Sequence, residues 1–226
     1  EGGKVKGKVF ITILIKATAN KTQDQLESEI SKAAQALQLD EIDAAILDFS
    51  SFEMSETEKS YLEYWTSCSN VVKGQTNSLG ACRNIGVSGV DNLASFISAV
   101  SSDENAVLPH IAQAEIHPFN SQSGLIEVCN QAGVQLVAKA VPEDLRGGNE
   151  GDIADDVARI EGRPRIQMMH KWLVNQYIGT TSNRGSGQNF LSEAISIQPF
   201  FFAKREVEEM NALNKNMTLV ELGYEV

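Results

Sequence analysis

Short β-branched, apolar runs alternate with helix-forming stretches along this 226-residue chain, and this alternation constrains the fold more than any other feature. The run KVFITILIK at 8–16 is nearly all apolar, as expected of a strand that is buried on both faces. Five further runs fit short strands, at 43–48, 81–89, 110–116, 134–141 and 177–181. Strands that alternate with helices in this way predict parallel βαβ units.

Helix-forming stretches with apolar residues at helical spacing lie between and after these runs. Thr22 with Gln25, and Ser55 with Glu58, have the spacing of capping boxes, and Asp91 is placed to cap a further helix. Helices are expected at about 22–37, 55–72, 91–100, 123–132, 165–176, 188–195 and 204–214. The chain therefore contains six strand–helix units.

A (β/α)₈ barrel needs eight such units in about 250 residues. Six units in a chain that opens without Met suggest an N-terminally truncated barrel that lacks its first two strands. We expect residues 1–226 to form this single, partial barrel domain. The rival is a doubly wound open sheet, but no Gly-x-Gly-x-x-Gly opens a helix after the first strand, so the dinucleotide fingerprint is absent.

Composition excludes several functional classes. The net charge of −11 argues against nucleic-acid binding, which requires clustered Lys and Arg. The chain has no run of 18 apolar residues, so no membrane span is expected. The three cysteines are scattered through apolar or amphipathic segments, which indicates buried thiols and a cytoplasmic protein. No two histidines share metal-ligand spacing, so we expect no metal.

Four segments resemble the aldo-keto reductases. IGVSGVDNLASFISAV is similar to the family's strand five, which ends Ile-Gly-Val-Ser-Asn, and AQAEIHPFN resembles its Asn-Gln-Val-Glu-x-His-Pro stretch. KWLVNQYIGTTSN is similar to the last barrel helix and strand, and NFLSEAISIQPFFFAKREVEEMNAL to the C-terminal helices. The resemblance runs from about residue 8 to residue 213 and implies a barrel of this ancestry.

The resemblance also identifies positions for catalysis. In that family a Tyr acts as general acid, a Lys lowers its pKa, a His orients the substrate carbonyl, and an Asp pairs with the Lys. Lys16 matches the Lys, whereas Asp48, in AAILDFSS, stands at the His position. An ionised carboxylate only accepts hydrogen bonds, so it cannot polarise a carbonyl and would repel a developing oxyanion. We expect Lys16 and Asp48 to be remnants that form an ion pair, with no catalytic residue.

The implied nicotinamide pocket is only partly kept. Ser88 and Gln113 match two residues that hold the nicotinamide amide, whereas Gly89 replaces the Asn between them and Lys139 replaces the Tyr that stacks on the ring. We therefore expect no cofactor, and NADP only if the protein is an enzyme after all.

One group of relatives shares this loss. The modifier subunits of glutamate–cysteine ligase are aldo-keto-reductase-like proteins without reductase activity, and NIGVSGVDNL, VQLVAKAVPEDL and KWLVNQYIGTTSNRGSGQNFL resemble their segments. This resemblance implies a pseudoenzyme that binds the ligase's catalytic subunit, improves its substrate use and weakens feedback by glutathione. The alternative is a divergent NADPH-dependent reductase, which the enzyme-like HPF at 117–119 favours.

Three aromatic features are expected to pack inside the fold rather than to bind a partner. They are Trp65, Trp172 and the run Phe200–Phe202.

Overall fold

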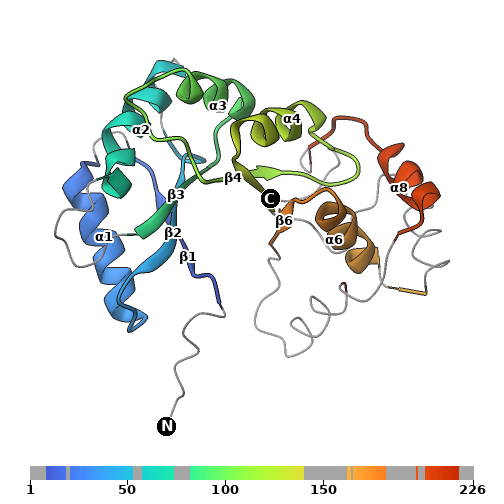
Figure 1. The fold of residues 1–226 in the computed structure, drawn as a ribbon, viewed down its shortest axis with the longest axis horizontal. Coiled ribbons are helices and arrows are strands. Elements are labelled where there is room, and N and C mark those ends of the chain that lie inside the picture. The colour runs from blue at the N-terminus through green and yellow to red at the C-terminus, as the bar shows by residue number, and fades with distance from the viewer. Residues whose placement is uncertain are drawn as a thin grey trace, which may run out of the picture. The chain divides into compact units, whose positions relative to one another are not determined.

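The computed structural model describes residues 9–18, 21–52, 58–73, 82–139, 162–163, 165–181, 197 and 202–218. Strands and helices alternate along the chain (Figure 1). The elements are β1 (Thr12–Lys16), α1 (Gln23–Ala36), β2 (Ile42–Asp48), α2 (Glu58–Lys73), β3 (Cys82–Ser88), α3 (Leu93–Ser101), β4 (Ile111–Glu115), α4 (Ser123–Ala132), β5 (Gln135–Lys139), α6 (Arg165–Asn175), β6 (Gly179–Thr180) and α8 (Lys204–Asn211). All six predicted strands are thus present, and the predicted helix near 188–195 lies outside the described residues.

The chain divides into two compact units. One comprises Glu1–Gln113 with Glu127–Gln135, and the other comprises Ala114–Ile126 with Leu136–Val226. In the first unit, β1, β2, β3 and β4 pair in parallel in chain order. Figure 1 shows α1, α2 and α3 on one side of β1, β2 and β3.

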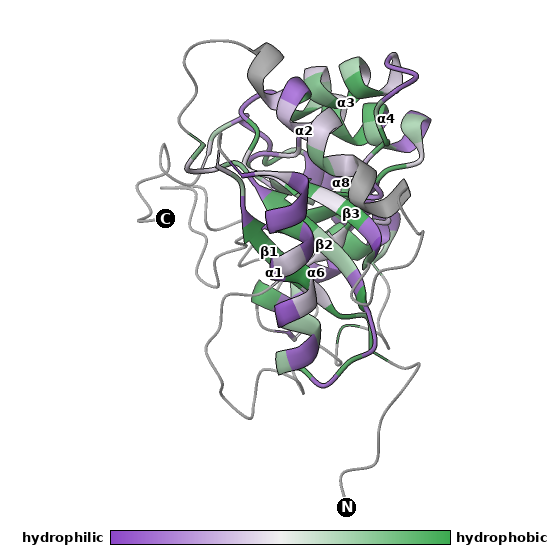
Figure 2. Cartoon of the chain, turned by 90° about the vertical axis from the view of Figure 1, so that its left-hand side faces the viewer, coloured by the Kyte–Doolittle hydropathy of each residue, from purple (hydrophilic) through white to green (hydrophobic). Residues whose placement is uncertain are grey.

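The core of the first unit lies between these strands and helices. Five apolar residues of β2, Ile42 and 44–47, are buried, as expected of a strand covered on both faces. Viewed from the helix side, α1 is largely hydrophilic, and β1 and β2 are largely hydrophobic (Figure 2). Trp65 is fully buried, donates its indole N–H to the Val107 carbonyl at 2.7 Å, and packs edge-on against Phe96. The prediction of a core role for Trp65 is confirmed.

Two helix starts test the predicted caps. Thr22 and Gln25 form the predicted capping box, in which the Thr22 hydroxyl accepts from the Gln25 backbone N–H and the Gln25 side chain accepts from Thr22. The cap predicted at Asp91 is wrong by one residue, because the Asn92 side chain accepts from the Ser95 N–H at 3.1 Å. Asn and Asp cap equally well, so local sequence alone could not choose between them. Ser55 lies outside the described residues.

The three cysteines are buried and form no disulfide, as predicted. Burial raises the pKa of the Cys129 thiol to about 11, and it also raises the pKa of Cys82. Thiols with raised pKa carry little thiolate near neutral pH, so these two act as small apolar side chains.

The second unit centres on α6 and on the pairing of β5 with β6. Val137 and Ala138 pair in parallel with Gly179 and Thr180, so the strand predicted over 177–181 is only two residues long. Tyr177 precedes it with a φ of 60°, which is incompatible with an extended strand. The predicted strand start was therefore wrong by two residues.

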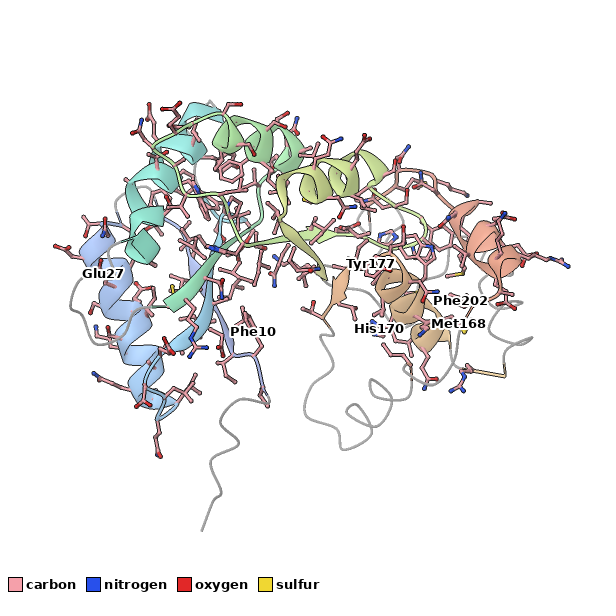
Figure 3. The ribbon with its side chains drawn as sticks, viewed as in Figure 1. Phe10, Glu27, Met168, His170, Tyr177 and Phe202 are labelled. Atoms are coloured by element: carbon pink, nitrogen blue, oxygen red, sulfur yellow. The ribbon has the colours of Figure 1, made fainter. Side chains whose placement is uncertain are left out.

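Aromatic residues also pack in the second unit as predicted. Trp172 is buried and donates to the Asn211 side-chain oxygen at 2.8 Å, which ties α6 to α8. Phe202, half-buried, packs against the pair Met168 and Ile197 (Figure 3). Phe200 and Phe201, together with the glycine-rich stretches 146–156 and 183–189, lie outside the described residues.

We expect His170 to make the stability of this unit depend on pH. Its Nδ1 lies 2.6 Å from the Thr180 hydroxyl, and burial lowers the pKa of His170 because the charged ring would lose its hydration. In the unfolded chain the imidazole of His170 takes up a proton at about pH 6.5, whereas in the folded chain it does so only at lower pH. Folding stability should therefore be fully present above about pH 6.5 and fall as the pH drops below it.

Urea denaturation of the protein and of His170→Gln, at about pH 7.5 and about pH 5.5, checks this expectation. The substitution should make the loss of stability on acidification smaller. An equal loss in both proteins would show that other groups cause it.

Candidate functional site

Four of the predicted site residues lie side by side at one edge of the first unit's sheet. The register pairs Lys16 with Asp48, Asp48 with Ser88, and Ser88 with Gln113. Lys16, Asp48 and Ser88 are the last residues of β1, β2 and β3. In open and closed parallel α/β sheets alike, this carboxyl-terminal edge is where ligands bind.

Asp48 binds its own chain two residues further on. Its Oδ2 accepts from the Ser50 hydroxyl at 2.8 Å, and its Oδ1 accepts from the Ser50 backbone N–H at 3.3 Å. Asp commonly makes such a turn with the residue two positions later. The predicted ion pair is wrong, because no ion pair joins the Lys16 ammonium to the Asp48 carboxylate among the described residues.

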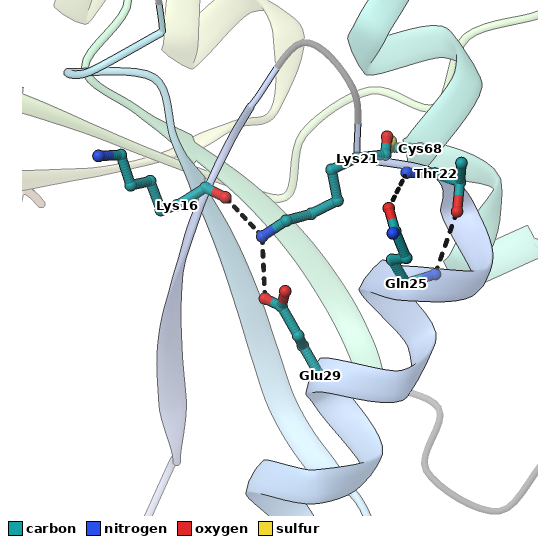
Figure 4. A network of polar contacts seen from close by, with 6 residues as sticks. All are labelled: Lys16, Lys21, Thr22, Gln25, Glu29 and Cys68. Atoms are coloured by element: carbon teal, nitrogen blue, oxygen red, sulfur yellow. Dashed lines mark hydrogen bonds and ion pairs between the residues drawn. The ribbon is translucent and has the colours of Figure 1, made fainter.

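The backbone of Lys16 has a different role. Its carbonyl accepts from Lys21 Nζ at 2.7 Å, and Lys21 also pairs with Glu29 at 2.9 Å (Figure 4). Lys21 follows β1 and precedes α1, so this contact fixes the connection between the two elements.

Gly89 follows β3 and closes tightly over the Asp48 turn. Its φ is +72°, and a Cβ built there would lie 2.4 Å from the Ser50 backbone nitrogen and 2.8 Å from Asp48 Oδ1. Only glycine fits both the conformation and the space. The Asp48 turn thus occupies the place that the side chain of any other residue at position 89 would need.

The remaining predicted positions differ in their surroundings. Ser88 is fully buried and Gln113 is half-buried. Lys139 is half-buried at the end of β5, in the second unit. Sequence reasoning missed Ser50, although an Asp followed two residues later by Ser is itself a turn signal.

The enzyme-like HPF segment, residues 117–119, accepts hydrogen bonds from the segment that follows α8. His117 and Asn120 form a two-way backbone bridge, and the Phe119 carbonyl accepts from the backbone N–H groups of Lys215 and Met217. His117 is fully buried, with Nε2 3.0 Å from Glu115 Oε1 and with Nδ1 lacking a hydrogen-bond partner. These contacts give the segment a packing role that does not require catalysis.

The described ranges contain no group of three His, Cys, Asp or Glu side chains that could hold a metal ion. In that same part of the chain, none of the helices combines the length and the apolar character that a membrane crossing needs.

Comparison with known proteins places the sequence of this chain in one family. The model of the Aldo/keto reductase family matches residues 4–142. Aldo-keto reductase family 1 member A1 from Homo sapiens is 26% identical over 166 residues, which cover 69% of this chain and 48% of that protein. Aldose reductase C from Dictyostelium discoideum is 26% identical over 161 residues, covering 69% of this chain and 46% of the relative. The chain thus spans about half the length of these curated relatives.

Solved structures confirm the predicted fold class. The Bombyx mori aldo-keto reductase in complex with NADP superposes with a TM-score of 0.72 at 21% identity, covering 95% of this chain and 71% of that one. The apoform of Gox0644 superposes with a TM-score of 0.74 at 15% identity, covering 98% of this chain and 77% of that one. The six parallel strands and the helices that alternate with them match this barrel fold over most of the chain. The chain belongs to the aldo/keto reductase family.

Proposed function

We propose that this protein keeps the aldo/keto reductase fold without the family's carbonyl chemistry, and that it acts as the modifier subunit of glutamate–cysteine ligase. The loss of chemistry rests on one observation. Asp48 stands where the family's His is expected, and both of its carboxylate oxygens accept hydrogen bonds from Ser50. A carboxylate used in this way offers no proton to a carbonyl oxygen.

The residues present do not fit the nicotinamide site that the family resemblance implies. Ser88 and Gln113 remain in register, but Gly89 contributes no side chain, and the space beside it is filled by the Asp48 turn. Lys139 stands where the resemblance implies a stacking aromatic ring, and a lysine side chain has no aromatic face to stack on nicotinamide. The residues present therefore do not support hydride transfer from this cofactor.

The choice of partner is supported by the local sequence resemblance to ligase modifier subunits in the strand–turn segments NIGVSGVDNL and VQLVAKAVPEDL. A fold that is kept while its chemistry is lost is well suited to regulation through surface contacts. Regulation of this kind is a coupling free energy of about 1–3 kcal/mol, or roughly 5–150-fold in affinity.

Kinetics of the ligase's catalytic subunit test this proposal directly. Adding the protein should lower the Michaelis constant for glutamate by about 5-fold or more and raise the glutathione concentration needed for inhibition. The two proteins should also co-elute on gel filtration. If the two proteins elute separately and the kinetics do not change, the protein is not the modifier subunit.

A second candidate function is a divergent NADP(H)-dependent reductase. The relatives reported above are named as reductases, which favours this candidate over a ligase subunit, and Lys16, Ser88 and Gln113 keep their places in the row. Calorimetry with NADPH separates the two candidates. The modifier role predicts weak or undetectable binding, and a submicromolar dissociation constant, equivalent to more than about 8 kcal/mol, would support the reductase.

A further inference from the structure

A polar pocket of about 340 Å³ lies beside the connection from β1 to α1, separate from the row of strand ends. It is lined by Thr18, Lys21, Gln25, Ser28, Glu29 and Lys32. Four of these six residues come from one face of α1, with the helical spacing i, i+3, i+4 and i+7. The other two, Thr18 and Lys21, precede the helix, so the pocket lies between one face of α1 and the residues just before it.

Part of the lining is fixed before any ligand arrives. Lys21, whose side chain is only 11% exposed, bridges the Lys16 carbonyl and Glu29 Oε2 (Figure 4). The Gln25 side-chain oxygen is used by the Thr22 backbone N–H in the capping box. The amide NH₂ of Gln25 therefore remains available as a donor.

The charges of the lining favour an anion. Lys21 and Lys32 carry two positive charges against one negative charge on Glu29, although the whole chain has a net charge of −11. Lys32 is exposed, and within the described ranges its ammonium makes no ion pair. A single positive charge thus remains uncompensated beside the Ser28 hydroxyl and the Gln25 amide.

We propose that this pocket binds the carboxylate group of a small, singly charged organic anion. Lys32 supplies the charge, Ser28 and Gln25 donate hydrogen bonds, and the Lys21–Glu29 pair forms a fixed wall. A doubly charged phosphate fits less well, because the two lysines and one glutamate of the lining leave a single positive charge, which compensates only one negative charge. This inference stands independently of the proposed function, since none of these residues belongs to the row of strand ends.

Amide-proton NMR of the isotopically labelled protein tests the site, with sodium acetate as the probe and sodium chloride at equal ionic strength as the reference. Acetate should cause saturable shifts at Gln25, Ser28 and Lys32, with millimolar affinity. Lys32→Gln should weaken binding about three- to tenfold, within the range of a charge-assisted hydrogen bond at a partly exposed site. Lys32→Arg should retain it.

The matched control is Lys204→Gln, which removes an exposed helical lysine from α8 and should leave acetate binding unchanged. Equal weakening by both substitutions, identical shifts with chloride, or tighter binding of inorganic phosphate would each overturn the proposal.

Discussion

The protein mixed with NADPH and a panel of aldehydes should show no turnover above background. The reason is Asp48, which accepts hydrogen bonds from Ser50 and has no proton to donate where charge would develop on the substrate oxygen. The loss of a single such donor lowers kcat by about 10²–10³-fold, and a repelling carboxylate in its place lowers it further. Spectrophotometric measurement of NADPH oxidation is sufficient to detect activity.

Restoring the family's residue should not restore the reaction. In Asp48→His, position 89 is still glycine and position 139 is still lysine, so the cofactor remains poorly held. Turnover in the unmodified protein that disappears in Lys16→Met would contradict the prediction and would establish the reductase as the function.

Gly89→Ala should lower the free energy of unfolding by about 2–5 kcal/mol. About 1–2 kcal/mol is expected from a side chain at positive φ. A further contribution of about 1–3 kcal/mol is expected because the new Cβ would lie 2.4 Å from the Ser50 backbone nitrogen and the turn must move. Urea denaturation monitored by circular dichroism measures the change.

Two glycines separate these contributions. Gly133 has the same φ of +72° but no atom within 4 Å of its added Cβ, so Gly133→Ala should cost only about 1–2 kcal/mol. Gly124 lies in α4 without either constraint, so Gly124→Ala should stabilise the protein by about 0.5–1 kcal/mol. If Gly89→Ala costs no more than Gly133→Ala, the turn around Asp48 is not tightly packed.

The number and order of the described strands were predictable because their signals are local. Each strand is an apolar run, and α1 carries its own capping box at Thr22 and Gln25. Strand ends were less predictable, because a strand extends only as far as its neighbour pairs with it. The strand expected from residue 8 begins at Thr12, where pairing with Ala44 of β2 starts, and Val9 and Phe10 before it are exposed.

The row formed by Lys16, Asp48, Ser88 and Gln113 was also accessible from sequence, since parallel strands bring their carboxyl ends to one edge. The hydrogen-bond partner of Asp48 could not be predicted from the sequence. Lys16 is its neighbour across the sheet, but Ser50 lies only two residues along the chain and can reach both carboxylate oxygens.

The sequence by itself thus determined the alternation of strands and helices and the residue types at the strand ends, because both depend on side-chain pattern along a single chain. Only the tertiary structure decided how the Asp48 turn packs under Gly89 and how the HPF turn holds the segment after α8. These contacts join residues that are about 40 and about 100 positions apart, and their distances depend on the packing of elements between them, which no local pattern encodes.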